Sequence, residues 1–412
     1  MGKPNIRFKG YTEDWEQRKL GDFGKATGGT SIESEFSEDG IYKVISIGSY
    51  SENSVYNDQG IRAIKSDKTS NRVLNRNDLT MILNDKTTSG NIIGRVLLIE
   101  ESGIYVYNQR TERIEINLDE YDPVFLYEML NAPNIREKII KQAQGNTQIY
   151  VNWTAISLLE YMIPSKEEQV KIGEYLHSIS NLITLHQRKY DETKKLKKCM
   201  LQKMFPKEGE KVPEIRFSGF TGDWKQRKFG DMVIIERGGS PRPIDKFITE
   251  DENGLSWVKI GDAPEQGNYI TRTKEKIKTE GLSKTREVHP GDLILSNSMS
   301  FGRPYIMAID GCIHDGWLLI RDHEKKFDLK YLCCMLGTDM MLFQYKQMAA
   351  GSTVNNLNKE LVGNTVVKYP SPAEQSKIGV YFSTLDGIIT LHKKKCDEFR
   401  NIKKFMLQNM FI

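Results

Sequence analysis

One long segment of this chain occurs twice. Residues 164–205 read PSKEEQVKIGEYLHSISNLITLHQRKYDETKKLKKCMLQKMF, and residues 370–411 match them at 22 of 42 positions with a constant offset of 206. A repeat of this length constrains the fold strongly, because each copy must form the same element and the chain must contain two related halves.

Each copy predicts one long helix. Pro164 and Pro370 stand just before the start, and Ser165 and Ser371 are the candidate N-caps. A stripe at seven-residue spacing predicts a helix-packing seam; its members are Ile172, Ile179, His186, Thr193, Met200, Ile378, Leu385, His392, Phe399 and Met406. A second seam is predicted for Tyr175, Leu182, Leu196, Tyr381, Ile388 and Ile402.

The two helices are predicted to pair with each other. At about 1.5 Å per residue each stripe is about 58 Å long, which is more than one small domain covers. Short connections favour an antiparallel pair, because the segment between the helices then bridges neighbouring ends. Packing of each helix on its own domain remains the alternative.

A second repeat lies upstream of each helix. Residues 4–22 and 213–231 match at 13 of 19 positions with an offset of 209. We call these two segments the clasps. Trp15 and Trp224, with aromatic and apolar neighbours, predict that the clasps pack on a domain edge, and a nucleic-acid surface formed by the clasp arginines is the alternative; these are Arg7, Arg18, Arg216 and Arg227.

The segments between clasp and helix predict two α+β heads. Short β-rich runs such as LTMILN, RVLLIEE and DLILSN are bounded by turn residues, and residues 123–143 and 328–350 carry helical patterns. The heads correspond only faintly, with Gly94-Arg95 matching Gly302-Arg303. We therefore predict an internal pseudo-twofold repeat of two globular α/β recognition domains and two long antiparallel coiled-coil helices, with domains at 1–163, 164–205, 206–369 and 370–412. The termini should then lie close together, with Pro4 beside Phe411.

Composition narrows the class of protein. The 412 residues are 38% hydrophobic, which is enough for real cores. There is no run of 18 apolar residues, so no membrane span is expected. Five cysteines without a CxxC pair predict a reducing, cytoplasmic location.

Motifs for catalysis are not found in the sequence. It holds no G-x-x-x-x-G-K-[ST] loop and no G-x-G-x-x-G loop, and its six histidines lack metal-ligand spacing. We therefore expect no catalytic residue, no cofactor-binding residue and no metal ligand. His186 and His392 would share one layer of an antiparallel pair, as a polar layer that fixes register.

The head loops carry residue types that contact DNA. Asn, Gln and Arg bind base edges, whereas Ser, Thr and Lys hold phosphates. The DNA-binding candidates are Asn84, Lys86, Thr87, Thr88, Arg95, Gln109, Arg110, Arg242, Lys246, Asn297, Ser298, Ser300, Arg303 and His314.

Three motifs together resemble a known family. P-E-I-R-F-x-G-F-x-G-D-W in the clasp, E-Q-x-K-I at the helix start and K-K-x-M-L-Q-x-M-F at the helix end resemble the specificity subunit of type I restriction-modification systems. The resemblance covers the whole chain. It implies two target recognition domains that each read half of a bipartite double-stranded DNA site, with helices that set the spacer.

The resemblance also implies partners. Two methyltransferase subunits would dock on the helices and bind S-adenosylmethionine, and two ATP-driven restriction subunits, with Mg, would complete the enzyme. The chain itself would be non-catalytic. Recognition domains vary within this family, so it supplies no contact residues. The competing hypotheses are a nuclease or methyltransferase acting alone, and a protein–protein scaffold with two unlike heads.

Overall fold

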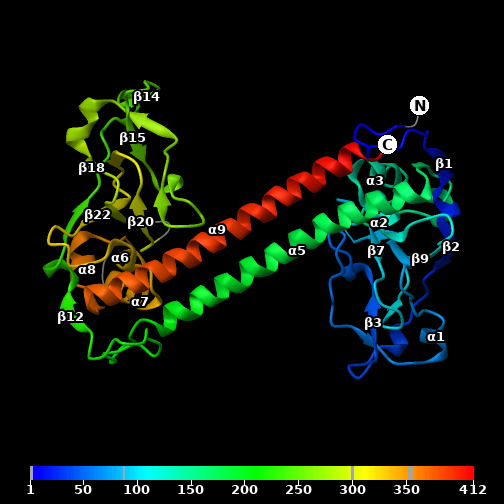
Figure 1. The fold of residues 1–412 in the computed structure, drawn as a ribbon, viewed down its shortest axis with the longest axis horizontal. Helices are drawn as coiled ribbons and strands as arrows, with labels where there is room; N and C mark the ends of the chain where they lie inside the picture. Colours follow the sequence, from blue (N-terminus) through cyan, green and yellow to red (C-terminus); the bar gives the residue numbers. More distant parts are fainter. Residues whose placement is uncertain (1–2, 87–88, 298–300, 351–355) are drawn as a thin grey trace. The chain divides into compact units, whose positions relative to one another are not determined.

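The computed structural model describes residues 3–86, 89–297, 301–350 and 356–412. It divides into two compact units (Figure 1). Unit 1 is Met1–Leu185 with Cys396–Ile412, and unit 2 is His186–Lys395. Each unit contains one head and parts of both long helices, α5 (Lys166–Lys203) and α9 (Pro372–Asn409), which are 38 residues each. Both helices were predicted from the first repeat.

The head of unit 1 is built on two small sheets. The first is antiparallel, in the order β2 (Gly24–Gly28), β9 (Thr111–Ile116), β5 (Leu79–Ile82) and β7 (Val96–Leu98). The second has β3 (Tyr42–Ile45) between β4 (Arg62–Ala63) and a parallel β8 (Tyr105–Tyr107). β6 (Asn84–Asp85) pairs with β10 (Ile149–Tyr150). The helices of this head are α1 (Asp67–Ser70), α2 (Pro123–Asn131), α3 (Pro133–Ile140) and α4 (Trp153–Ile156); α2 and α3 share a core with β5 and β9.

The head of unit 2 has the same plan with larger sheets. One sheet runs β13 (Ile234–Arg237), β22 (Trp317–Arg321), β19 (Leu293–Ser296), β20 (Pro304–Met307) and β16 (Tyr269–Ile270). The other runs β14 (Ile248–Thr249), β17 (Glu275–Ile277), β15 (Leu255–Val258), β21 (Gly311–Ile313) and β18 (Arg286–Val288). Its helices are α6 (Leu329–Leu336), α7 (Asp339–Ala350) and α8 (Lys359–Gly363).

The predicted strands LTMILN, RVLLIEE and DLILSN are found as β5, β7 and β19. Each predicted helical stretch is instead two helices. Pro133 begins α3 directly after α2, and Gly337 is the C-cap of α6. Both residues are typical helix boundaries, because proline is favoured in a first turn and glycine just past a last one.

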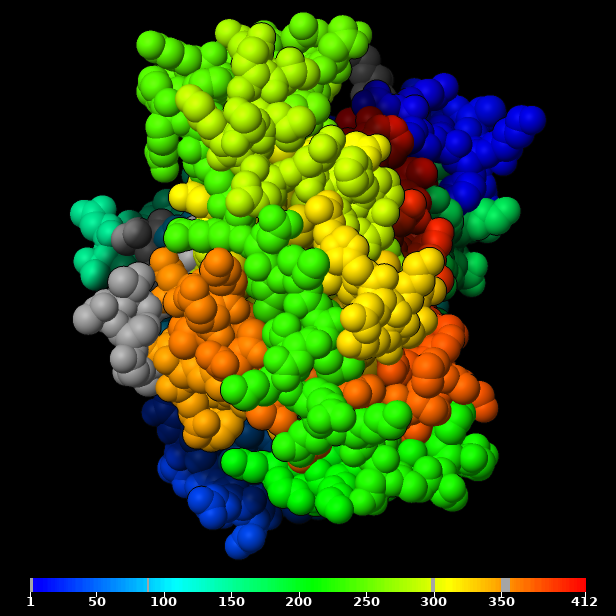
Figure 2. Space-filling view, turned by 90° about the vertical axis from the view of Figure 1, so that its left-hand side faces the viewer, coloured from blue at the N-terminus to red at the C-terminus, as the bar shows by residue number. Residues whose placement is uncertain are grey.

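Each clasp adds a strand beside the entry of a long helix. β1 (Glu16–Lys19) pairs with β11 (Glu160–Ile163), and β12 (Lys225–Lys228) pairs with β23 (Val366–Tyr369). In Figure 2 the green segment that contains β12 lies against the orange segment that contains β23. Trp15 and Trp224 are each 4% exposed, so packing on the domain edge is confirmed.

Two clasp arginines hold the first turns of the long helices. The guanidinium of Arg7 donates two 2.7 Å hydrogen bonds to Glu168, which is fully buried. Arg216 donates bonds of 2.7 and 2.8 Å to the equivalent Glu374, which is 1% exposed. Packing is therefore the role of these two arginines, whereas β1 and β12, which carry Arg18 and Arg227, are exposed strands.

The glutamines that follow connect each helix to its head. Gln169 Oε1 accepts a hydrogen bond from the Asp122 backbone N–H, and Gln375 Oε1 accepts the same bond from Asp328, both at 2.9 Å. Asp122 and Asp328 are the N-caps of α2 and α6. The repeated Glu-Gln pair therefore fixes the angle at which each long helix leaves its head.

The long helices pack antiparallel within each unit. In unit 1, Cys396 Sγ lies 3.4 Å from the Ile183 carbonyl, and Lys403 lies 2.7 Å from Ser180 Oγ. In unit 2, His186 Nδ1 and His392 Nδ1 are 2.9 Å apart, and Lys197 pairs with Asp386. As the residue numbers on α5 increase, the numbers of the residues that they contact on α9 decrease, so the two helices run in opposite directions. The shared histidine layer is thus confirmed.

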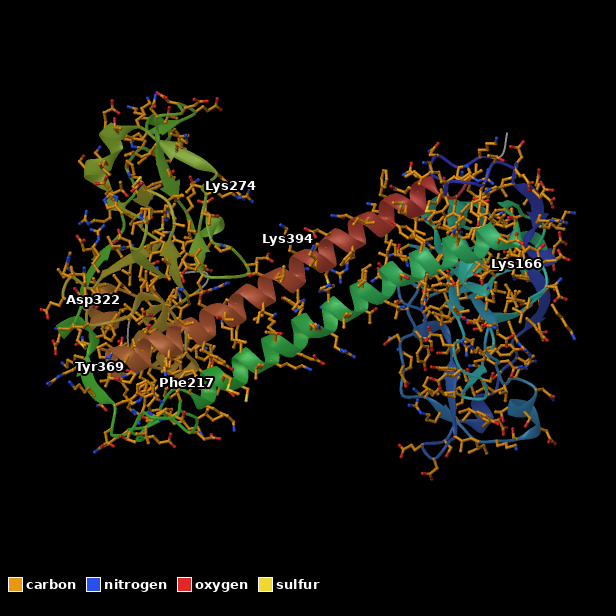
Figure 3. The ribbon with its side chains drawn as sticks, viewed as in Figure 1. Lys166, Phe217, Lys274, Asp322, Tyr369 and Lys394 are labelled. Carbon is orange, nitrogen blue, oxygen red and sulfur yellow. The ribbon has the colours of Figure 1, made fainter. Side chains whose placement is uncertain are left out.

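The second predicted seam is wrong in part. Leu182, Leu196, Ile388 and Ile402 are 37–42% exposed. Tyr175 and Tyr381 instead meet the clasp phenylalanines edge-on, with ring centroids 5.7 Å from Phe8 and 6.0 Å from Phe217. Figure 3 shows Phe217 beside the end of α5, and Tyr369 just before α9 begins. Seven-residue spacing located the first seam, but it does not say whether a flanking row meets the partner helix or solvent.

The two ends of the chain meet in unit 1. The Ile6 backbone N–H donates a 3.0 Å hydrogen bond to the Asn409 carbonyl, and Phe411 packs on Phe125 with ring centroids 5.6 Å apart. Figure 1 shows the end of α9 beside α3 and the N-terminal segment. In unit 2 the Ile215 N–H donates the equivalent 2.9 Å bond to Lys203. The predicted proximity of Pro4 and Phe411 is confirmed.

Candidate nucleic-acid interface

In unit 1 several loops meet at one end of the larger sheet. Gly29 N donates to the Thr111 carbonyl at 2.8 Å, Leu83 N donates to Arg110 at 2.9 Å, and Val151 N donates to Leu83 at 2.8 Å. These bonds bring together loops that are far apart in the sequence and contain most of the unit 1 candidates.

Unit 2 repeats the same three bonds. Gly238 N donates to Trp317 at 2.9 Å, Asn297 N donates to Gly316 at 2.9 Å, and Leu357 N donates to Asn297 at 3.0 Å. Gly29 and Gly238 are required here, because a Cβ atom would lie 2.0 Å from the Asn108 carbonyl oxygen at Gly29 and 2.2 Å from the His314 carbonyl oxygen at Gly238. We call each of these two regions a loop cluster.

The bonds also align the two heads residue by residue. Arg110 corresponds to Gly316, so Gln109 corresponds to Asp315 and Asn108 to His314. The segments YVYNQR (105–110) and CIHDGW (312–317), when aligned end to end, would instead pair Asn108 with Asp315, which is a register shifted by one residue. The predicted match of Gly94-Arg95 with Gly302-Arg303 is confirmed, because Ile82 N donates to Arg95 and Ser296 N donates to Arg303, both at 3.0 Å.

The two matched arginines are held by their own heads. Arg95 donates to Ser54 Oγ at 2.9 Å and to the Asn91 carbonyl at 3.1 Å, and burial lowers its pKa. Arg303 donates to the carbonyls of Glu265 and Gly267 at 3.0 and 3.3 Å and lies 4.9 Å over the Tyr305 ring. Each guanidinium group therefore holds a loop of its own head in place. A contact to a DNA base would use the N–H groups of the guanidinium that are not in these bonds.

The other unit 1 candidates differ in exposure. Lys86 and Arg110 are exposed, Asn84 lies half-buried in β6, and Gln109 Nε2 donates to Glu33 at 3.2 Å. Arg110 has a φ of +69°, a conformation that few side-chain-bearing residues adopt. Thr87 and Thr88 lie outside the described residues.

Arg72 belongs to the unit 1 cluster, although the sequence did not single it out. Its guanidinium donates to the Gly28 carbonyl at 2.7 Å and to Thr30 Oγ1 at 3.0 Å, and lies 5.2 Å over the Tyr107 ring. Glu112 on β9 is 6% exposed, and burial raises its pKa to about 7 despite the charge of Arg72. Arg72 and Glu112 come from separate segments, so no local motif signals them.

In unit 2, Asp315 is the centre of the loop cluster. Its Oδ1 accepts a hydrogen bond from Ser240 Oγ at 2.7 Å and lies 2.9 Å from His314 Nε2, and its backbone carbonyl accepts a hydrogen bond from Asn297 Nδ2 at 2.9 Å. Arg237 Nε also approaches that carbonyl at 3.4 Å. Asp315, Ser240 and Arg237 were not among the predicted residues.

The unit 2 candidates also differ in exposure. Arg242 and Lys246 are exposed, whereas Asn297 is 2% exposed and anchors the loop. His314 Nδ1 accepts the Gly316 backbone N–H at 2.9 Å, so Nε2 carries the proton that reaches Asp315. Burial lowers the pKa of His314, which keeps it neutral. Ser298 and Ser300 lie outside the described residues.

The described residues form neither a metal site nor a membrane-spanning helix. Over the described ranges, no group of three or more His, Cys, Asp or Glu side chains could hold a metal ion. No helix in the part of the chain that the structure describes is long and apolar enough to cross a membrane.

The sequence matches a family model and several curated proteins. The model of the type I restriction modification DNA specificity domain matches twice, at residues 12–195 and 221–400. The type I restriction enzyme MjaVIII specificity subunit of Methanocaldococcus jannaschii is 23% identical over 410 residues, which is 95% of this chain and 91% of that protein. The putative MjaX specificity subunit of the same organism is 23% identical over 325 residues, 76% of this chain and 73% of that protein.

Solved structures share the fold. An S subunit of a type I restriction-modification system from M. genitalium aligns with a TM-score of 0.68 at 17% identity, covering 100% of this chain and 99% of that one. A chain from a structure of type I R-M complex assembly aligns with a TM-score of 0.53 at 15% identity, covering 96% of this chain and 97% of that one.

Proposed function

Since this chain belongs to the family of type I restriction modification DNA specificity domains, we propose that it is the DNA-reading subunit of a type I restriction-modification complex. Each loop cluster reads one half of a bipartite duplex target. The observation that carries this proposal is that both clusters share one backbone frame and present different side chains. Gln109 and Arg110 stand where Asp315 and Gly316 stand. One frame with two sets of base-reading groups suits two different half-sites.

The long helices serve as the docking surface for methyltransferase subunits and set the spacer between the half-sites. In unit 1 the exposed apolar side chains on the helices include Leu182, Leu185, Ile402 and Phe405, at 37–53%. In unit 2 they include Leu196, Ile388 and Leu391, at 37–52%. Rows of exposed apolar side chains mark interaction surfaces. Their occurrence in both units supports two methyltransferase subunits, which two restriction subunits join.

The chain contributes recognition, and its partners contribute the chemistry. S-adenosylmethionine, ATP and Mg would bind to the partner subunits. All five cysteines are free thiols, which suits the reducing cytoplasm.

Exchange of one head tests the proposal. Residues 23–163 are replaced by the matching segment of a relative, and the complex with its methyltransferase partner selects duplexes from a random library. We expect one half of the selected target to change and the other half to stay. A change in both halves would contradict two independent readers, and absence of any sequence selection by the parent complex would favour the scaffold hypothesis.

A further inference from the structure

Asp315 occupies the same place in unit 2 that Gln109 occupies in unit 1. In unit 1, Gln109 directly precedes Arg110, whose carbonyl accepts the hydrogen bond from Leu83 N. In unit 2, Asp315 directly precedes Gly316, whose carbonyl accepts the equivalent hydrogen bond from Asn297 N. Both side chains are half-buried. A glutamine can donate and accept hydrogen bonds, whereas an ionised aspartate only accepts.

The two carboxylate oxygens of Asp315 differ. Oδ1 is used inside the head, by Ser240 Oγ and His314 Nε2. Oδ2 has no hydrogen-bond or ion-pair partner among the residues that the structure describes, and the side chain is 34% exposed. One oxygen is therefore fixed, and the other is available to a ligand.

The charge of Asp315 is maintained by its neighbours. Burial raises its pKa, but the hydrogen bond from Ser240 and the positive charges of Arg237 and Arg242 lower it by more, so the net shift is downward. A carboxylate on a DNA-reading surface repels phosphates. It is favourable there when it accepts a hydrogen bond from the DNA, and the donors at the base edges of the major groove are the exocyclic amino groups of cytosine and adenine.

On the basis of the proposed function, we propose that Asp315 is a specificity-determining residue of unit 2, whose Oδ2 accepts a hydrogen bond from the exocyclic amino group of a cytosine or adenine. The fixed Oδ1 sets the orientation of the carboxylate. Ser240 and His314 act as positioning residues for it.

Asp315→Asn tests this assignment with the least disturbance. The amide oxygen can keep the hydrogen bond from Ser240. The amino group then takes the place of Oδ2, so a hydrogen-bond acceptor becomes a donor. In duplex selection by the complex, we expect one base pair in one half-site to change, and binding of the original duplex to fall about 10-fold to 100-fold. Asp310→Asn is the matched control, because Asp310 has a 76% exposed side chain in the same unit, and its selected site should not change.

Base analogues provide a test that needs no altered protein. The parent complex binds duplexes in which each cytosine or adenine of that half-site lacks its exocyclic amino group, one at a time. One analogue should weaken the parent about 10-fold to 100-fold and leave the Asp315→Asn complex unaffected. If the parent selects a target but Asp315→Asn selects the same one, or loses affinity equally for all duplexes, Asp315 only positions the loop. If the parent selects no target, the proposed function fails instead.

Discussion

Loss of Arg216 should locally unfold the start of α9. Glu374 is 1% exposed, and both of its oxygens are bound by Arg216, at 2.7 and 2.8 Å. Removing one partner of such a buried pair leaves an uncompensated charge, which costs about 3–5 kcal/mol. Arg216 also donates to the Gly222 carbonyl at 2.8 Å, so the clasp turn loses a support as well.

Hydrogen exchange measured by mass spectrometry can follow this change in one element. At about 1.4 kcal/mol per tenfold, a cost of about 3–5 kcal/mol should make the amides of the first turns of α9 exchange about 100-fold to 4000-fold faster in Arg216→Ala. Arg227→Ala is the matched control, since Arg227 lies on an exposed strand of the same clasp, and its exchange should stay within a few-fold of the parent.

The double variant Arg216→Ala with Glu374→Gln separates charge from packing. It removes the buried charge together with its partner, so much of the lost protection should return. Equal exchange in Arg216→Ala and Arg227→Ala would refute the role of the pair. If the double variant did not regain protection from exchange, the lost clasp contacts of Arg216 would matter more for the stability of this helix start than the unpaired charge of Glu374.

Two further predictions concern the heads. Burial raises the pKa of Glu112 from 4.5 to about 7, so the folded state binds more protons than the unfolded state between these values. The free energy of unfolding should therefore fall as pH rises from 4.5 to 7. In urea titrations, Glu112→Gln should be more stable than the parent above pH 7, and this difference should vanish near pH 4.5. Arg303→Ala should weaken binding of the complex to its specific duplex by about 1–3 kcal/mol, whereas substitution of the exposed Arg272 by alanine should not. Equal loss of affinity for random duplexes would show that Arg303 contacts a phosphate. No loss would show that Arg303 only supports its own head through its bonds to the Glu265 and Gly267 carbonyls.

The repeated parts of the fold could be predicted because their partners are repeated too. The sequence did not predict that Arg7 pairs with Glu168, but both residues lie in repeated segments, so the pair recurs as Arg216 with Glu374. The repeat offsets also predicted that His186 lies opposite His392 and that Pro4 lies beside Phe411, close to where Ile6 bonds Asn409.

The structure of the loop clusters was harder to predict from the sequence, for a physical reason. Their side chains are held by carbonyls and hydroxyls from distant, unrepeated segments, as Arg303 is held by Glu265 and Gly267. Residue type alone therefore could not separate Asn297, which is buried and structural, from Asp315, which keeps an available oxygen. Only the shared hydrogen bonds of the two heads identified Asp315 as the equivalent of Gln109.

The equivalence of the two helix ends predicts that the chain can be reopened elsewhere. In unit 2 the end of α5 and the next clasp are joined by Pro206–Val212, and the Ile215–Lys203 bond closes the turn. In unit 1 the same bond, between Ile6 and Asn409, forms without a covalent link. A linker of about seven residues between the termini should therefore span them, since such a linker reaches about 15 Å.

The new ends belong between Glu208 and Gly209. Both residues are exposed, and the bonds from Lys368 Nζ to the Lys207 and Glu210 carbonyls, at 2.8 and 2.6 Å, would hold the two cut ends in place. The permuted chain should assemble with its methyltransferase partner and select the same duplexes as the parent. A cut within α6, where Tyr331 and Leu336 are fully buried, is the control that should abolish assembly. If the permuted chain failed like this control, the two helix ends would not be equivalent, and the covalent connection in unit 2 would be essential to the fold rather than incidental to it.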